Sequence, residues 1–235
     1  MLKKSKRLRC KVPQQHIGVY GGTFDPIHNG HIQVARSVLS VFELDELIIM
    51  PAFVPPHKSR RSVTHAYHRY AMAVLATLAE AELKVSMLEI DNPDRPFTID
   101  TIERLQQIYG AGASFYLIMG ADSFQEINTW KQYRRLLDSC NIIATARPGY
   151  SFSTEHLPED ARLRVINLVG EKKKPKRPID KTLIFLTDTV WCDISSTEIR
   201  RARAAGQSIR GYVPPSVADY IEKYGLYKER NETTG

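Results

Sequence analysis

The chain contains little cysteine and no long apolar run. Its three cysteines, Cys10, Cys140 and Cys192, are far apart, odd in number and without Cys-x-x-Cys spacing, which argues against a disulfide framework or a structural zinc site. No apolar run approaches the ~20 residues that span a bilayer, and the basic N-terminus lacks the apolar segment of a signal peptide. We therefore expect a cytoplasmic protein with no membrane span.

Several well-known signatures are missing as well. The sequence has no G-x-G-x-x-G fingerprint and no G-x-x-x-x-G-K-[ST] loop, which argues against a dinucleotide-dependent dehydrogenase and against a P-loop ATPase. It also has neither a G-x-S-x-G elbow nor a Cys/His nucleophile arrangement. Any nucleotide chemistry must therefore use another arrangement of residues.

The formal net charge of +7 is distributed unevenly. Residues 1–11 carry +6 and residues 171–177 carry +4, so the rest of the chain carries −3. A basic protein invites a nucleic-acid interpretation, but runs of like charge are usually solvated tails or loops. We expect a flexible basic extension over 1–15, a basic loop insertion over 171–181 and no stable nucleic acid partner.

Apolar segments alternate with helical patterns along the chain. The sequence predicts strands over 17–20, 46–51, 84–90, 114–119 and 141–146, with weaker ones over 164–169 and 182–186. It predicts helices over 30–42, 65–82, 196–205 and 215–224, one capped by Thr98 and one containing Tyr133. This order favours an α/β fold, Rossmann-like and doubly wound, with a mostly parallel sheet covered by helices on both faces. We expect a single domain over residues 16–228 and a C-terminal tail over residues 229–235.

The first motif is Gly21-Gly22-Thr23-Phe24-Asp25-Pro26-Ile27-His28-Asn29-Gly30-His31. Its glycines let the backbone approach a ligand closely, and a helix start attracts anions through its open N–H groups and partial positive charge. A lone histidine there would be a cap or a core residue. Two histidines three residues apart project to one side and can donate hydrogen bonds to phosphate oxygens. Metal ligation would need a further ligand, and none is evident nearby.

The second motif is Ile194-Ser195-Ser196-Thr197-Glu198-Ile199-Arg200. Ser195 with Glu198 three residues later matches a capping box, and a capped helix start is also an anion site. Arg200 lies one turn further on, and its guanidinium can make a planar two-point contact with phosphate.

Three other positions have a structural and a functional interpretation. Asp122, just after the strand that ends at Gly120, is either a helix cap or an acceptor for ribose hydroxyls. Trp130 is either a core residue or a plate for a planar ring. Lys58 follows a strand and is either solvated or a mobile phosphate ligand.

Together these motifs resemble the H-x-G-H nucleotidyltransferase superfamily and, within it, the bacterial nicotinate-nucleotide adenylyltransferases. Supporting stretches are residues 51–58, Glu89 together with 98–101, 117–130, 146–150 and 207–227, and the resemblance covers about residues 16–228. It implies transfer of AMP from ATP to nicotinate mononucleotide, giving deamido-NAD and pyrophosphate, with Mg²⁺.

The resemblance also implies roles for individual residues. His28, His31 and Arg200 would be catalytic, with His31 making the main contact to the transition state. The ATP-binding residues would be Gly21, Gly22, Thr23, Phe24, His28, His31, Ile194, Ser195, Ser196 and Arg200. The mononucleotide-binding residues would be Lys58, Thr98, Gly120, Asp122, Trp130 and Arg147, with Trp130 stacked on the pyridine ring. No residue is assigned to the metal.

One departure from the family pattern leaves alternatives open. The family usually has Ser-Tyr-Thr where this chain has Pro96-Phe97-Thr98, so the phenol is missing and proline removes a backbone donor. Transfer to nicotinamide mononucleotide, or to both mononucleotides, therefore stays open. Less favoured are a phosphopantetheine adenylyltransferase and a non-catalytic nucleotide- or RNA-binding module. Whether the chain forms a homo-oligomer is also open.

Overall fold

The computed structural model describes residues 14–53, 63–92, 94, 97–147, 149–171, 175, 181–188 and 194–228. The predictions about Lys58, Pro96, residues 1–13, most of 171–181 and the tail over 229–235 lie outside these residues. None of the described helices is long and apolar enough to cross a membrane.

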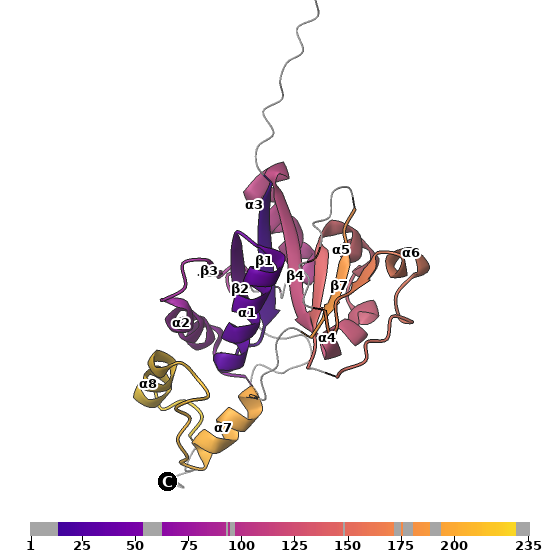
Figure 1. The fold of residues 1–235 in the computed structure, drawn as a ribbon. Coiled ribbons are helices and arrows are strands. Elements are labelled where there is room, and N and C mark those ends of the chain that lie inside the picture. Colours follow the sequence, from indigo (N-terminus) through magenta and orange to yellow (C-terminus); the bar gives the residue numbers. More distant parts are fainter. Residues whose placement is uncertain are drawn as a thin grey trace, which may run out of the picture.

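A parallel sheet of seven strands forms the centre of the described part of the chain (Figure 1), which confirms the predicted Rossmann-like α/β class. The strand order is β3-β2-β1-β4-β5-β7-β6. The strands are β1 (Gln15–Gly22), β2 (Glu46–Pro51), β3 (Leu83–Val85), β4 (Ala113–Gly120), β5 (Asn141–Thr145), β6 (Val165–Asn167) and β7 (Ile184–Thr187). The chain winds outward from β1 to β3 and then returns to place β4 beside β1, so the order reverses there. Parallel sheets bind ligands at the carboxyl ends of strands at such a reversal.

Helices cover both faces of this sheet, as the sequence predicts (Figure 1). On one face lie α1 (Asn29–Phe42), α2 (Ala66–Thr77) and α8 (Pro215–Lys223), which pack against alternate strand residues such as Ile49 and Ile118. On the other face lie α3 (Thr98–Tyr109), α4 (Ala121–Gln125) and α5 (Tyr133–Ser139), packed against residues such as Ile48 and Leu117. Because side chains alternate along a strand, both faces of the central strands are apolar and buried.

The remaining helical segments are short or lie near the sheet's edges. They are η2 (Gly110–Gly112), η3 (Ile127–Thr129), α6 (Glu159–Arg162) and α7 (Ser196–Ala204). In Figure 1, α7 lies below the carboxyl ends of the strands, beside α8.

Two predicted boundaries are wrong. The third strand covers only Leu83–Val85, because the next ladder bond would need an N–H from Pro51 on β2, and proline has none. The chain instead turns, with the Asp91 N–H donating to the Met87 carbonyl at 2.9 Å. The second helix ends at Thr77 rather than continuing to residue 82.

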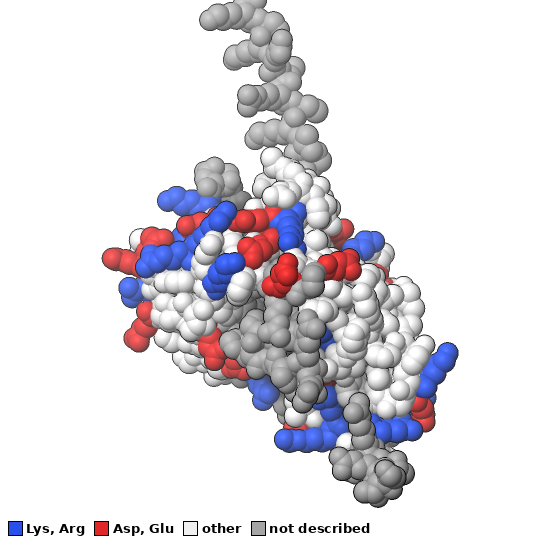
Figure 2. Space-filling view, turned by 180° about the vertical axis from the view of Figure 1, so that it is seen from behind, with Lys and Arg blue, Asp and Glu red and all other residues white. Residues whose placement is uncertain are grey.

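On the back of the molecule, acidic and basic side chains are interspersed in several places, with uncharged areas between them (Figure 2). Ion pairs such as Arg135–Glu103 at 2.6 Å and Lys131–Asp100 at 3.5 Å link the region of α5 to α3. This mixture fits the near-balanced charge expected for the body of the chain.

Candidate active site

The turn between β1 and α1 holds its shape by close packing. Phe24 adopts a positive φ of 49° and is buried, with its ring edge-to-face against His31 at 5.0 Å and against Tyr20 at 5.5 Å. A Cβ on Gly22 would lie 2.8 Å from the Phe24 ring, so this position requires glycine. Phe24 therefore supports His31 from the core, and it lines neither of the two cavities described below.

His28 and His31 lie side by side at the start of α1. Their rings stack with centroids 3.6 Å apart, and the His28 backbone N–H donates to Nδ1 of His31 at 3.2 Å. That hydrogen bond makes Nδ1 of His31 an acceptor, which assigns its proton to Nε2. Nδ1 of His28 is buried without a hydrogen-bond partner among the described residues. The pair therefore has hydrogen-bonding capacity that the described protein groups leave unused.

Burial keeps both imidazoles neutral near pH 7. It lowers the pKa of His28 to about 4, and it lowers the pKa of His31 well below its usual value, with a further decrease from the charge of His28. The neutral imidazoles can donate hydrogen bonds to phosphate. A bound anion would oppose the shift in pKa, because a nearby negative charge favours the protonated, positively charged form.

The second motif meets the first directly. Ser196 at the start of α7 donates to the Pro26 carbonyl at 2.9 Å, and Nη1 of Arg200 donates to the Asp25 carbonyl at 2.7 Å. The two motifs, both assigned to ATP by the resemblance, are therefore in direct contact through the backbone of the turn before His28. The predicted capping box is wrong, because the Ser195 side chain, the N-cap of α7, makes no capping hydrogen bond within the described residues. Ile194 precedes it, half-buried against the core.

Two cavities open at the carboxyl ends of β1 and β4. The first, about 350 Å³, lies towards α3 and is lined by Gly21, Gly22, Thr23, Thr98 and Trp130 among others; it is called the tryptophan cavity below. The second, about 360 Å³, lies towards α1 and is lined by His28, His31, Asp122 and Arg147 among others; it is called the histidine cavity. Gly120, the last residue of β4, lines both cavities, so they meet where the strand order reverses.

This division separates the predicted site residues. Arg147, expected on the mononucleotide, lines the histidine cavity, whereas Gly21, Gly22 and Thr23, expected on ATP, line the tryptophan cavity. Arg200 lines a third, shallower cavity together with Arg201 and Lys228.

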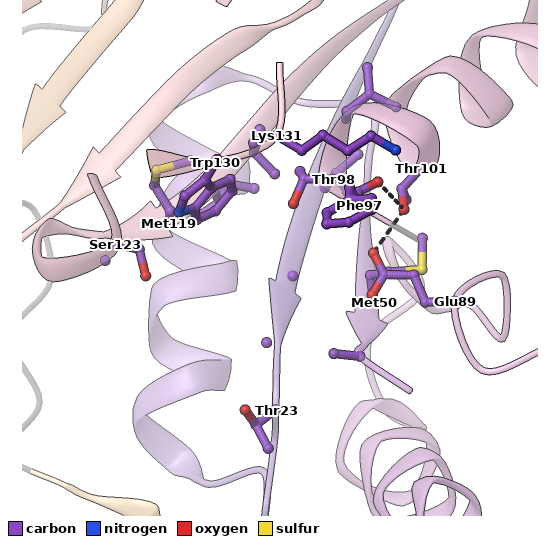
Figure 3. A pocket seen from close by; sticks show the side chains of 18 of the residues that line it. Thr23, Met50, Glu89, Phe97, Thr98, Thr101, Met119, Ser123, Trp130 and Lys131 are labelled. Atoms are coloured by element: carbon purple, nitrogen blue, oxygen red, sulfur yellow. Dashed lines mark hydrogen bonds between the residues drawn. The ribbon is translucent and has the colours of Figure 1, made fainter. Parts of the chain in front are cut away.

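In the tryptophan cavity, Trp130 lies beside Met119 on one side, and Phe97 lies with Thr98, Thr101 and Glu89 on the other (Figure 3). Trp130 is half-buried and packs partly against the core, so the core interpretation holds in part, and stacking on a planar ring stays a prediction. Thr98 is the first residue of α3 and Phe97 is its N-cap, so the expectation that Thr98 caps this helix is wrong. The Phe97 N–H donates to Asp100 at 3.3 Å. Thr98 is one of the residues that line the cavity. Asp122 is likewise inside its helix, α4, whose N-cap is Gly120.

The residues predicted for the site do not include two charged residues that line this cavity, although Glu89 belongs to a stretch that carries the family resemblance. Glu89 accepts a hydrogen bond from the Thr101 hydroxyl at 2.9 Å, and burial raises its pKa to about 7 despite that bond. Lys131 places its ammonium 4.1 Å from the centre of the Phe97 ring. Glu89 falls in the segment wrongly predicted as strand, and Lys131 follows Trp130 directly, which is the one signal that could have identified it.

The chain matches a family model and many curated proteins. The model, described as cytidylyltransferase-like, matches residues 19–202. A probable nicotinate-nucleotide adenylyltransferase from Thermoanaerobacter sp. (strain X514) is 41% identical over 216 residues, which are 92% of this chain and 96% of that protein. One of the same name from Thermus thermophilus is 37% identical over 212 residues, 90% of this chain and 99% of that protein.

Solved structures show the same fold. The Plasmodium falciparum nicotinic acid mononucleotide adenylyltransferase complexed with NaAD superposes with a TM-score of 0.67 at 21% identity, covering 91% of this chain and 98% of that one. The sequence matches show that the chain belongs to the nicotinate-nucleotide adenylyltransferases of the cytidylyltransferase-like family.

Proposed function

We propose that this protein transfers AMP from ATP to nicotinate mononucleotide, giving deamido-NAD and pyrophosphate. One observation carries the proposal: two cavities, each lined by groups suited to one nucleotide, meet at Gly120. ATP takes the histidine cavity, and the mononucleotide takes the tryptophan cavity. Their phosphates then meet at the carboxyl ends of β1 and β4.

The reaction needs positioning and charge stabilisation more than proton transfer. An oxygen of the mononucleotide phosphate bonds to the α-phosphorus of ATP, the bond from that phosphorus to the bridging oxygen breaks, and pyrophosphate leaves with the electron pair. The attacking phosphate is already ionised near pH 7, so no general base is required. The protein must hold two anionic groups in line and offset the charge on the transferring phosphoryl group.

Four residues of the histidine cavity and three from α7 and its N-cap have roles in this proposal. His31 and His28 donate hydrogen bonds to the phosphates of ATP, with His31 making the main contact in the transition state. The Asp122 carboxylate accepts from a ribose hydroxyl. Arg147 contacts the phosphate of the mononucleotide, which must reach into this cavity to attack. Ser195, Ser196 and Arg200 hold the outer phosphates, for which Arg200 must exchange its bond to the Asp25 carbonyl.

Mg²⁺ enters as part of the ATP complex. Within the described residues, no three His, Cys, Asp or Glu side chains are grouped so that they could hold a metal ion. Mg²⁺ in such sites is held largely by substrate phosphates and water, so we assign no protein ligand to it.

The tryptophan cavity recognises the pyridine ring and its substituent. Trp130 stacks on the ring, and Thr98 at the start of α3 meets the carboxylate, because a helix start favours negative charge. Lys131 adds a positive charge nearby. These groups favour the acid over the amide, although Phe97 supplies no hydroxyl.

A pyrophosphate-release assay with ATP–Mg²⁺ tests this proposal, with nicotinate and nicotinamide mononucleotides compared side by side. We expect release with both ATP and the acid present and a higher kcat/KM for the acid. No release with either mononucleotide would overturn the proposed activity, and a higher kcat/KM for the amide would overturn the proposed specificity. The same preparation in a sedimentation experiment would report whether the chain is a homo-oligomer.

A further inference from the structure

A buried arginine ties together three segments around the two cavities. Arg69 on α2 is fully buried and donates to the carbonyls of Thr23 at 2.7 Å and Thr64 at 2.8 Å. It also donates to the carbonyls of Ala52 at 2.6 Å and Phe53 at 2.8 Å. Thr23, Ala52 and Phe53 line the tryptophan cavity. Arg69 therefore fixes the turn after β1 against the end of β2, which form one wall of that cavity.

A buried carboxylate holds the other side of the same turn. Asp25 is 3% exposed; its Oδ1 accepts from the Tyr227 hydroxyl at 2.7 Å and its Oδ2 from the Thr64 N–H at 3.2 Å. Its own carbonyl accepts from Arg200, and its charge acts favourably on Arg69. Asp25 lies three residues before His28, so these contacts fix the position of the turn between β1 and α1 that leads to His28 and His31.

Tyr227 reaches this cluster from the segment that follows α8. It has a positive φ of 61°, a conformation that is uncommon for a bulky residue. Burial and the nearby charge of Asp25 raise the pKa of its phenol, so the hydroxyl stays protonated and remains a donor. Tyr227 thus links the segment after α8 to the Asp25 carboxylate through a side-chain hydrogen bond.

We propose that Asp25, Arg69 and Tyr227 are positioning residues for the transfer step, which makes the segment after α8 part of the active site. The buried charges of Asp25 and Arg69 are weak evidence for stability, because desolvation offsets most of the attraction between them. Their hydrogen bonds hold the segments that Asp25 and Arg69 contact in a single arrangement. Those segments are the wall of the tryptophan cavity and the turn that ends in His28 and His31. The kinetic part of this inference rests on the function proposed above.

Tyr227→Phe tests the inference with the smallest change, because it removes one hydroxyl and keeps the ring. The Asp25 carboxylate, which is 3% exposed, then loses one of its donors. We expect kcat per folded molecule to fall about 10-fold, since misplaced catalytic groups cost rate, while the KM for either substrate changes less than about threefold. Tyr224→Phe is the matched control: this tyrosine is 52% exposed in the same segment and should leave kcat unchanged.

Arg69→Lys is the second variant. It keeps the positive charge, but a single ammonium cannot replace a planar fork that bonds four carbonyls. We expect a larger loss of kcat than for Tyr227→Phe. If Arg69→Lys does not fold, Tyr227→Phe decides the question alone.

Hydrogen exchange supplies a readout that does not depend on activity. In Tyr227→Phe, amides over 24–31 should exchange at least about fivefold faster than in the Tyr224→Phe control, because local opening becomes easier. Unchanged exchange there would overturn the proposal. So would a kcat per folded molecule equal to that of the parent protein. If the parent protein is itself inactive, the proposed function fails, and the exchange result alone decides on the positioning residues.

Discussion

The histidine and tryptophan cavities are similar in volume but differ in how the chain builds them. The histidine pair comes from one short segment, a turn and the first residues of a helix, so its geometry is largely local. The polar groups of the tryptophan cavity come from the segment before α3, from α3 itself and from the residues after η3. In the proposed assignment, the two histidines that bind phosphate belong to a local motif. The residues assigned to recognition of the ring are brought together by contacts across the fold.

We expect the largest loss of activity when His31 in the histidine cavity is replaced. His31→Ala removes the proposed donor to the transferring phosphoryl group, so we expect pyrophosphate release to fall by at least about 100-fold. A thermal melt should show a folded protein. His65→Ala, at an exposed histidine before α2, is the control. Near-normal turnover by His31→Ala would remove its catalytic assignment.

Replacing Trp130 should affect only the other cavity. Trp130→Ala removes the stacking surface, and we expect the KM for the mononucleotide to rise about 10-fold, since one stacked ring contributes roughly 1–3 kcal/mol. The KM for ATP should stay within about twofold of the parent value. Steady-state kinetics with each substrate varied in turn measures this split. A rise in both KM values would show that the cavities are not separable in this way.

The pH dependence that Glu89 gives to the tryptophan cavity has the opposite sign to that of the histidine cavity, where the lowered pKa values of His28 and His31 cost stability as pH falls below 6.5. The pKa of Glu89 is raised to about 7 by burial, so the folded protein holds this proton more tightly than the unfolded chain does. Stability is therefore lost as pH rises from about 4.5 through 7, and the full cost is present above that range. Glu89→Gln keeps an acceptor for Thr101 without the charge.

We expect Glu89→Gln to stabilise the protein by on the order of 1–3 kcal/mol at pH 8 and by much less at pH 5. Urea titrations of both proteins at the two pH values measure the difference. An equal effect at pH 5 and pH 8 would mean that Glu89 does not titrate in this range.

Lys131 should have the smallest effect. Lys131→Met keeps the length of the side chain without its charge, so kcat/KM for the acid should fall about threefold, the size expected for an exposed charge pair. The value for the amide should not change. Competition between the two mononucleotides in one reaction measures the ratio directly. An equal loss for both would mean that Lys131 acts through packing rather than charge.

The two regions also differ in how far the sequence predicts them. The glycine turn, the histidine pair and the parallel sheet follow from periodicity and from residues a few positions apart. The bond from Tyr227 to Asp25 joins residues 202 positions apart, and the bond from Arg69 to Thr23 joins residues 46 positions apart. Such pairs leave no local pattern. Arg69 gave one usable signal, because it shares the buried face of α2 with Ala66 and Met72, where an unpaired charge would be costly.

A crystal structure of the protein with deamido-NAD would test the central claim most directly, because this product carries both halves of the reaction. The adenylate half should lie in the histidine cavity, with the phosphates beside His28 and His31, and the pyridine ring should lie against Trp130. A ligand bound in the reverse orientation, or away from Gly120, would contradict the assignment of one nucleotide to each cavity.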